Sequence, residues 1–115
     1  MSKYASFSKS LHPQVIECMV QLGLKLKGAR KRRRWTLANF AQRVGIARST
    51  AQRLEKGDPS INLGAFVNAI FILGLEAEIK NLLAPERDTR GFLSVMSREP
   101  KRIRETLEEK NKLNF

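Results

Sequence analysis

Apolar residues recur every three or four positions near the start of the chain, which is the spacing of one face of a helix. Between residues 14 and 33 this pattern predicts a long helix, with Pro13 suited to its first turn. Gly23 and Gly28 lower the helical propensity, so a break near Gly23 is left open. The predicted apolar face consists of Val15, Met19, Leu22, Leu26 and Ala29.

A second helix is predicted over residues 37–44, with Thr36 suited to cap its N-terminus. Gly45 follows, and glycine readily adopts the left-handed conformation that ends a helix. A third helix is then predicted from about Ala47 until Gly57. The buried positions predicted for these two helices are Leu37, Phe40, Ala41, Val44, Ala51 and Leu54.

The segment from residue 63 to residue 73 predicts a fourth helix, capped by Ser60 or Asn62. Because it is more apolar than the others, we expect it to be the central helix of the core. Residues 75–83 predict a fifth, short helix, although residues 77–79 also fit a brief strand. The apolar positions of the fourth helix are Leu63, Phe66, Ile70 and Leu73.

These patterns divide the chain into three parts. Residues 1–12 form a Ser-rich leader without periodicity, and residues 13–85 form one all-α domain of five helices. Residues 86–115 form a charged, basic tail that we expect to be extended or conditionally folded. A short helix after Pro100 fits the pattern but could not be stable alone.

The charge of the chain narrows the class of partner. The chain has 115 residues and carries 22 Lys and Arg against 11 Asp and Glu, a net charge of +11 that favours polyanions such as nucleic acid. Charge alone does not exclude membranes or acidic proteins as partners. However, no segment approaches the roughly 18 apolar residues of a membrane span, and no signal peptide is evident. We therefore expect a cytoplasmic protein without membrane association.

Reactive side chains are too sparse for catalysis or metal binding. The single Cys18 cannot form an internal disulfide, which fits a reducing cytoplasm. Neither Cys18 nor the single His12 has a second ligand at metal spacing. No constellation of nucleophile, base and orienting group is recognisable. We expect no metal, no cofactor and no enzymatic activity.

Residues 36–57 predict two helices joined by a glycine turn and packed closely at a steep angle. The second of these helices presents a polar outer face, Arg48, Ser49, Gln52 and Arg53, with the hydrogen-bonding chemistry to read base edges, unless it is merely a solvated face. Phosphate contacts are expected at the start of the first of these helices and at flanking polar and basic residues. The candidate phosphate contacts are Arg34, Thr36, Leu37, Arg43, Thr50 and Lys56.

Three further features lie within or beside this segment. Glu55 is unsuited to a DNA surface, but it can pair with a nearby arginine and fix its orientation. Trp35 is expected to cover the core rather than stack on bases. The basic run from Arg30 to Arg34 suits a helix C-terminus, phosphates, or a solvated turn.

The segment from Leu37 to Gly57 resembles the helix-turn-helix of the XRE family of phage-repressor-like regulators. The resemblance covers about Leu22 to Leu83 and includes Ala41, Gly45, Ile46, Leu54, Glu55 and Gly57. It implies a compact five-helix, lambda-repressor-like domain that dimerises on palindromic operator DNA. It also implies that Ala47 joins the base contacts, although many family members have a polar capping residue where this chain has Ala47.

A two-fold dimer would let two recognition helices read half-sites about one helical turn apart. We expect its interface to use exposed apolar residues of the fourth and fifth helices. The candidates are Phe71, Leu75, Ile79 and Leu82.

Residues 60–75 and the basic tail are similar to the HipB-like antitoxins that accompany HipA-type kinase toxins. This resemblance implies repression of the protein's own operon and binding of a HipA-like kinase, with Phe92, Leu93 and Phe115 as candidate contacts. The alternative for the tail is a disordered arm that adds non-specific DNA affinity. The alternative for the whole protein is an interaction module whose basic surface binds an acidic partner. Preference for an operator sequence would distinguish the two functions.

Overall fold

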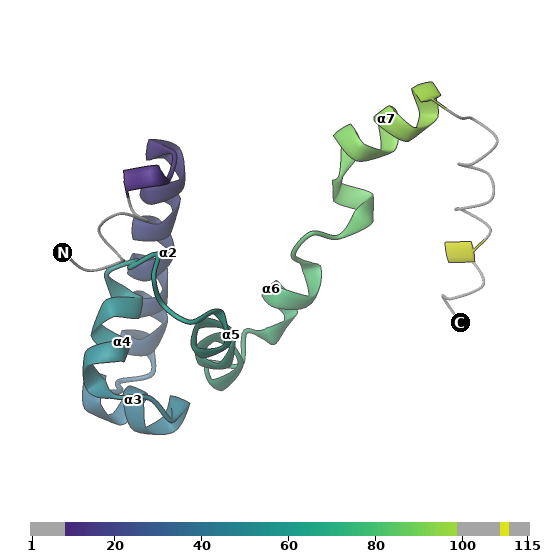
Figure 1. Cartoon of the computed structure of the whole chain (residues 1–115). Coiled ribbons are helices and arrows are strands. Elements are labelled where there is room, and N and C mark those ends of the chain that lie inside the picture. Colours follow the sequence, from purple (N-terminus) through teal and green to yellow (C-terminus); the bar gives the residue numbers. More distant parts are fainter. Residues whose placement is uncertain (1–8, 99–108, 111–115) are drawn as a thin grey trace. The chain divides into compact units, whose positions relative to one another are not determined.

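The computed structural model describes residues 9–98 and 109–110. Within this part of the chain, six α-helices have both ends defined and no strand occurs (Figure 1), so the fold class is all-α as predicted. A short 3-10 turn, η1, spans Pro85–Arg87. The α-helices are α2 (Pro13–Arg32), α3 (Leu37–Val44), α4 (Arg48–Glu55), α5 (Leu63–Ile72), α6 (Glu76–Asn81) and α7 (Thr89–Arg98).

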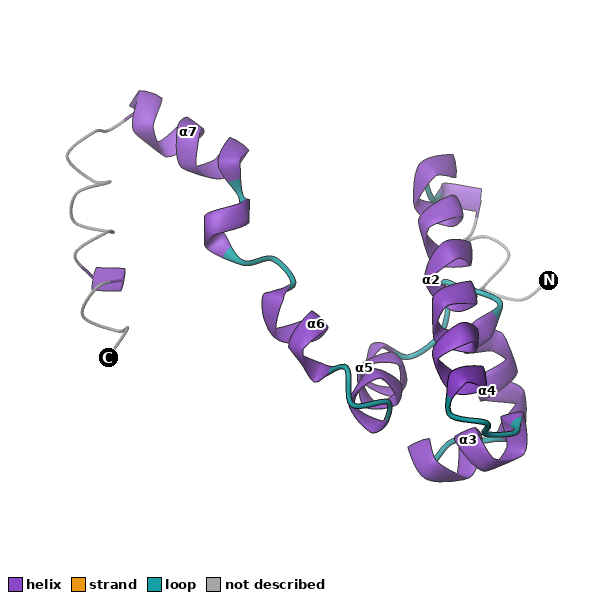
Figure 2. Ribbon diagram, turned by 180° about the vertical axis from the view of Figure 1, so that it is seen from behind, coloured by secondary structure: helices purple, strands orange, loops and turns teal. Residues whose placement is uncertain are grey.

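The chain separates into two compact units, residues 1–79 and residues 80–115. The core of the first unit is formed by α2, α3, α4 and α5 with the residue that follows α5. Helix α4 packs against α2 and α3, and α3 also packs against α5 (Figures 1 and 2). The buried apolar residues are Leu26, Ala29, Phe40, Ala41, Val44, Ala51, Leu54, Ala69 and Leu73.

Helix α2 is continuous, so the break considered at Gly23 does not occur. Gly23 is instead a point of close approach between α2 and the end of α4. A Cβ atom at this position would lie 2.5 Å from the carbonyl oxygen of Glu55 and 2.7 Å from the backbone nitrogen of Gly57. The missing side chain therefore lets two backbones touch.

The apolar face predicted for α2 is buried only in its second half. Leu26 and Ala29 are in the core, but Val15 and Leu22 are each 42% exposed. All buried residues of α2 lie from Gly23 onward, so the periodic pattern extends beyond the part that its neighbours cover. The sequence therefore predicted the apolar face but not which part of it is buried.

Helix α5 is not the central helix of the core, which corrects the expectation drawn from its apolar sequence. Of the two expected caps, Ser60 and Asn62, it is Asn62 that caps the helix, because its Oδ1 accepts a hydrogen bond from the N–H of Gly64 at 2.7 Å. However, Ala69 is the only buried residue within α5, and Leu63 is 73% exposed. The largest fully buried side chain among the described residues belongs instead to Phe40 of α3.

The second unit contains a helix in the part of the chain that we expected to be extended or conditionally folded. Residues 89–98 form α7, and Asp88 accepts a hydrogen bond at Oδ1 from the N–H of Gly91 at 3.0 Å in its first turn. Aspartate is a favoured residue at the start of a helix, but the sequence analysis did not consider Asp88 as a cap. The alternative strand at residues 77–79 is also wrong, because these residues belong to α6.

Some expectations concern residues near the ends of the chain. Residues 9–10, assigned to an unstructured leader, are helical. The helix considered after Pro100 lies almost entirely outside the described residues. Among the helices that the structure describes, none has the length and apolar character needed to cross a bilayer.

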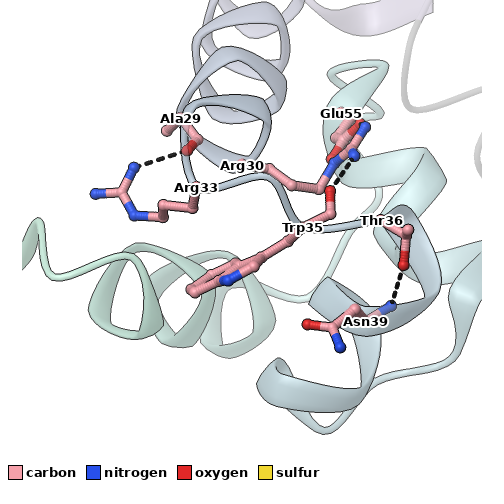
Figure 3. A network of polar contacts seen from close by, with 7 residues as sticks. All are labelled: Ala29, Arg30, Arg33, Trp35, Thr36, Asn39 and Glu55. Atoms are coloured by element: carbon pink, nitrogen blue, oxygen red, sulfur yellow. Dashed lines mark hydrogen bonds and ion pairs between the residues drawn. The ribbon is translucent and has the colours of Figure 1, made fainter.

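A buried ion pair joins α2 to α4 (Figure 3). Arg30 donates from Nε to Oε2 of Glu55 at 2.6 Å and from Nη2 to Oε1 at 3.0 Å, and each residue is 8% exposed. The remaining nitrogen, Nη1, donates to the carbonyl oxygen of Trp35 at 2.8 Å. One side chain therefore connects α2, the link before α3, and α4. The pairing of Glu55 with an arginine agrees with the sequence analysis.

Replacing one partner of this pair should be costly. Glu55→Gln would leave the buried guanidinium without a counter-charge, so we expect the free energy of unfolding to fall by about 3–5 kcal/mol. The double variant Arg30→Met with Glu55→Leu should recover much of that loss, because it removes both charges. Urea unfolding followed by circular dichroism measures both. A double variant no more stable than Glu55→Gln would contradict this account.

A matched pair of glycine substitutions tests the close approach in α2. Gly23→Ala should destabilise the protein by about 1–3 kcal/mol, because its Cβ would collide with backbone atoms. Gly28→Ala should stabilise it by up to about 1 kcal/mol, since its Cβ meets only the flexible end of Arg32 at 3.3 Å. The measurement is the midpoint of thermal unfolding of each variant. Equal shifts of the two midpoints would contradict the close packing of α2 against α4 at Gly23.

Candidate nucleic-acid interface

The turn between α3 and α4 is fixed by local hydrogen bonds. Thr36 starts α3, since its Oγ1 accepts a hydrogen bond from the N–H of Asn39 at 3.0 Å. Gly45 ends α3 in the left-handed conformation, with φ of 81°. The N–H groups of Gly45 and Ile46 donate to the carbonyl oxygen of Ala41 at 2.9 and 3.0 Å. The chain therefore passes from α3 into α4 within three residues.

Helix α4 has a buried inner face and a polar outer face. Ala51 and Leu54 are buried on the inner face, where small alanines let α3 and α4 approach closely. Arg48, Ser49 and Gln52 are exposed. The packing holds one side of the helix in place and leaves hydrogen-bonding groups on the other.

Helix α4 begins without a side-chain cap. Ala47 occupies the N-cap position in an extended conformation, and no side chain accepts a hydrogen bond there. The first N–H groups of any helix lack partners within the helix and favour an anion. Because Ala47 replaces the polar capping residue of many family members, the first N–H groups of α4 can donate to another acceptor.

Comparison with known protein families matches residues 21–81, more than half of the chain, to a model described as a helix-turn-helix domain. The chain belongs to the helix-turn-helix domain family. Proteins built on this motif are DNA-binding regulators, in which the second helix of the motif enters the major groove. In this helix-turn-helix protein, α3 and α4 form the motif and Gly45 makes its turn. No curated protein and no solved structure matches the chain significantly.

Arg53, near the end of α4, takes part in a polar network within the helix-turn-helix unit. Its Nε lies 2.8 Å from Oδ2 of Asp58, and its Nη2 donates to Oγ of Ser60 at 2.6 Å. Ser60 donates in turn to Oδ1 of Asp58 from its hydroxyl and its backbone N–H. The network closes the turn after α4 and orients the Arg53 guanidinium.

The Asp58 carboxyl is shifted by this network. Partial burial raises its pKa, but hydrogen bonds from Ser60 and Arg53, with the Arg53 charge, together outweigh that effect. The pKa of Asp58 therefore lies below its ordinary value of 3.8.

Three of the candidate phosphate contacts are exposed cations. Arg34 has a left-handed backbone, with φ of 58°, and Lys56 is the C-cap residue of α4. The guanidinium of Arg43 lies 4.4 Å from the centre of the Trp35 ring, and its Nε donates to Oδ1 of Asn39 at 2.6 Å. The other candidates lie near the first turns of α3 and α4: Thr36, Leu37 and Thr50.

Trp35 covers the core, which supports the structural reading. It is partly buried against the core and stacks on Phe40, with ring centres 6.4 Å apart. Figure 3 shows the Trp35 ring pointing away from Arg30 and Glu55, while its backbone carbonyl oxygen accepts the hydrogen bond from Arg30. Base stacking by Trp35 is therefore not supported.

The sequence analysis did not identify the role of Arg33. This side chain donates from Nη1 to the carbonyl oxygen of Ala29 at 2.7 Å and from Nη2 to that of Leu73 at 2.5 Å. It joins the C-terminal ends of α2 and α5. Within the basic run nothing distinguishes Arg33, because its partner Leu73 is 40 residues away. The exposed members of the run are Lys31, Arg32 and Arg34.

A groove of about 340 Å³ lies beside the polar face of α4, between α2 and α4. Its lining brings together Leu37, Gln52 and Lys56, which were proposed separately from the sequence. It also includes Lys27, which the sequence analysis missed. The sequence did not indicate a role for Lys27, because only the packing of α2 against α4 brings Lys27 next to Gln52 and Lys56.

The remaining candidates concern protein contacts. Phe71 is 61% exposed, Leu75 and Leu82 are also exposed, and Ile79 is half-buried. In the second unit, Phe92 and Leu93 are exposed on α7. Phe115 lies outside the described residues.

The network around Asp58 predicts a pH-dependent stability. Asp58→Asn should lower the free energy of unfolding by up to about 1 kcal/mol at neutral pH. Because the pKa is lower in the folded state, this contribution is complete above the ordinary pKa of 3.8 and is lost as pH falls through the folded value. Urea unfolding across that range should show the two proteins converging at acidic pH. A difference independent of pH would contradict the assignment.

Proposed function

We propose that this helix-turn-helix protein is a homodimeric, sequence-specific transcriptional repressor that reads operator DNA with α4. One observation carries the proposal. Arg48, Ser49 and Gln52 are exposed on one side of a helix whose opposite side is anchored by Ala51 and Leu54. Base recognition needs such polar groups on a rigid, exposed helix.

The residues of this face have the chemistry to discriminate between bases. Arg48 can donate two hydrogen bonds to guanine O6 and N7, and Gln52 can pair with adenine N6 and N7, each worth about 1–3 kcal/mol. Ala47 and Ser49 lie in the first turn, where an apolar methyl suits thymine and a hydroxyl suits several bases. Arg53 would reach the base edges with its guanidinium already oriented by Asp58.

Phosphate contacts would fix the register of α4 on the duplex. The proposed cations are Arg34, Arg43 and Lys56, and Lys27 joins them because it shares a groove with Lys56. Arg43 suits this role since Trp35 and Asn39 already hold its guanidinium. Near the helix starts the proposed contacts are Thr36, Leu37 and Thr50.

The proposed homodimer would use the exposed apolar surface of α5 and α6. A two-fold axis lets two copies of α4 read two half-sites about one helical turn apart. The large exposed area of Phe71 supports this surface. The proposed interface residues are Phe71, Leu75, Ile79 and Leu82.

The finer proposal is a cytoplasmic, HipB-like antitoxin of the XRE family that represses its own operon. Its second unit would bind a HipA-like kinase, with Phe92, Leu93 and Phe115 as contacts. The support is the resemblance of residues 60–75 and the exposure of Phe92 and Leu93. Among residues 80–98 no side chain is buried, so this segment retains apolar surface for a partner.

The first experiment compares binding of the purified protein to its own upstream DNA and to a random duplex of equal length, over a range of salt concentrations. A preference of about 10³-fold or more for the upstream DNA would establish a sequence-specific autoregulator. Equal binding that collapses with salt would favour the alternative, an interaction module whose basic surface binds an acidic partner.

Substitutions separate base contacts from phosphate contacts. Arg48→Ala and Gln52→Ala should each reduce the preference for operator DNA by about 10- to 100-fold while non-specific affinity changes little. Arg34→Ala should weaken binding to all DNA about equally and reduce the salt dependence. Fluorescence anisotropy with operator and random duplexes measures both. If the two kinds of variant acted alike, the assigned roles would be wrong.

A further inference from the structure

An apolar groove of about 280 Å³ lies on the first unit, beside α2 and the start of α5. It lies next to exposed apolar side chains, since Leu22 is 42% exposed and Leu63 is 73% exposed. Val15, about two turns before Leu22 on α2, is also exposed. The residues that line the groove include Met19, Leu22, Gly23, Pro59, Leu63 and Phe66.

This groove contains none of the candidate DNA contacts and meets that surface at Asp58, which pairs with Arg53. With about 100° per residue, Val15, Cys18, Met19 and Leu22 share one side of α2. Leu24 lies on roughly the opposite side of the helix and lines the other groove, which contains the candidate base contact Gln52. A protein bound to the apolar groove would leave α4 accessible.

The charge of this face indicates what can cover it. The chain carries a net charge of +11, yet the lining of the groove contains neither lysine nor arginine. Its one charged residue, Asp58, is paired with Arg53. In α2 between residues 13 and 22, Glu17 is the only Asp, Glu, Lys or Arg. Two copies of this strongly basic chain can therefore meet here without bringing the lysines or arginines of the two copies together. DNA or an acidic protein would find no lysine or arginine in the lining of the groove to pair with.

We propose that this face binds a second copy of the chain. The two α2 helices would lie antiparallel, so that Val15 and Leu22 of each copy cover the groove of the other. In a two-fold contact the same patch of both copies meets, so that patch must contain both a protrusion and a depression that fit each other. Here Val15 and Leu22 are the protrusion, and the groove is the depression. Leu63 and Phe71 lie near opposite ends of α5, so this contact differs from the proposed dimer interface. If the proposed function also holds, the contact links neighbouring dimers on DNA.

The single cysteine of the chain provides the test. Cys18 is exposed on this face, and a two-fold axis there brings the two thiols within reach of a short bismaleimide linker. The experiment uses the full chain with Phe71→Glu, which removes the other proposed self-association surface. We expect this protein to form Cys18-linked pairs, and to form pairs by sedimentation without the linker.

Two further substitutions in the same background make the test specific. Leu63→Glu places acids on the groove and should weaken self-association at least tenfold. The acid should not harm folding, because Leu63 is exposed and begins α5, where negative charge is favourable. The matched control is Leu24→Glu, at an exposed leucine on the other side of α2, and it should leave self-association unchanged.

The results of these experiments test the contact between two copies of the chain and do not depend on DNA binding. Equal association of the Leu63→Glu and Leu24→Glu proteins, or no linked pairs through Cys18, would overturn the proposal. Loss of Cys18-linked pairs in Leu63→Glu, with a native circular dichroism spectrum, would support it. Operator preference is measured separately, so failure of the proposed DNA reading would leave the result on self-association standing.

Discussion

Arg30 donates two hydrogen bonds to Glu55 and a third to the carbonyl oxygen of Trp35, so one side chain on α2 positions both α4 and the link before α3. A buried charge pair is tolerated only when its donors and acceptors are satisfied. Among the described residues, no buried side-chain polar atom lacks a partner. Together with the backbone contact at Gly23, the pair holds α4 at a defined position on α2.

The basic residues of the chain divide into two groups with different roles. Arg30 and Arg33 are used inside the first unit, where they connect α2 to α4 and α5. Arg34, Arg43 and Lys56 remain at the surface around the helix-turn-helix. The net charge therefore overstates the number of groups available to DNA, while the internal arginines determine the geometry in which the others are presented.

Apolar surface is distributed as unevenly as charge. The core is small and uses alanines at helix contacts, which brings α3, α4 and α5 close together. Large apolar side chains are left outside on the first half of α2, at Leu63, at Phe71 and on α7. Exposed apolar side chains grouped in this way are typical of interaction surfaces. A DNA-binding regulator that also binds other proteins, as we propose, would carry surfaces of this kind.

Helices α2 to α5, the cap at Thr36 and the turn at Gly45 follow from the sequence alone, because periodicity, capping and left-handed glycine are local properties. The polar outer face of α4 follows for the same reason. The sequence left Ser60 and Asn62 open as the cap of α5 and did not identify α7. Other features depend on residues that are distant in the chain, so only the tertiary structure decided them. Gly23 is a contact between α2 and α4 rather than a break, Arg33 joins the ends of α2 and α5, and Lys27 lines the same groove as Gln52. The tertiary structure also decided that Val15, Leu22 and Leu63 stay exposed, because periodicity identifies an apolar face but not how much of it a neighbouring helix will cover.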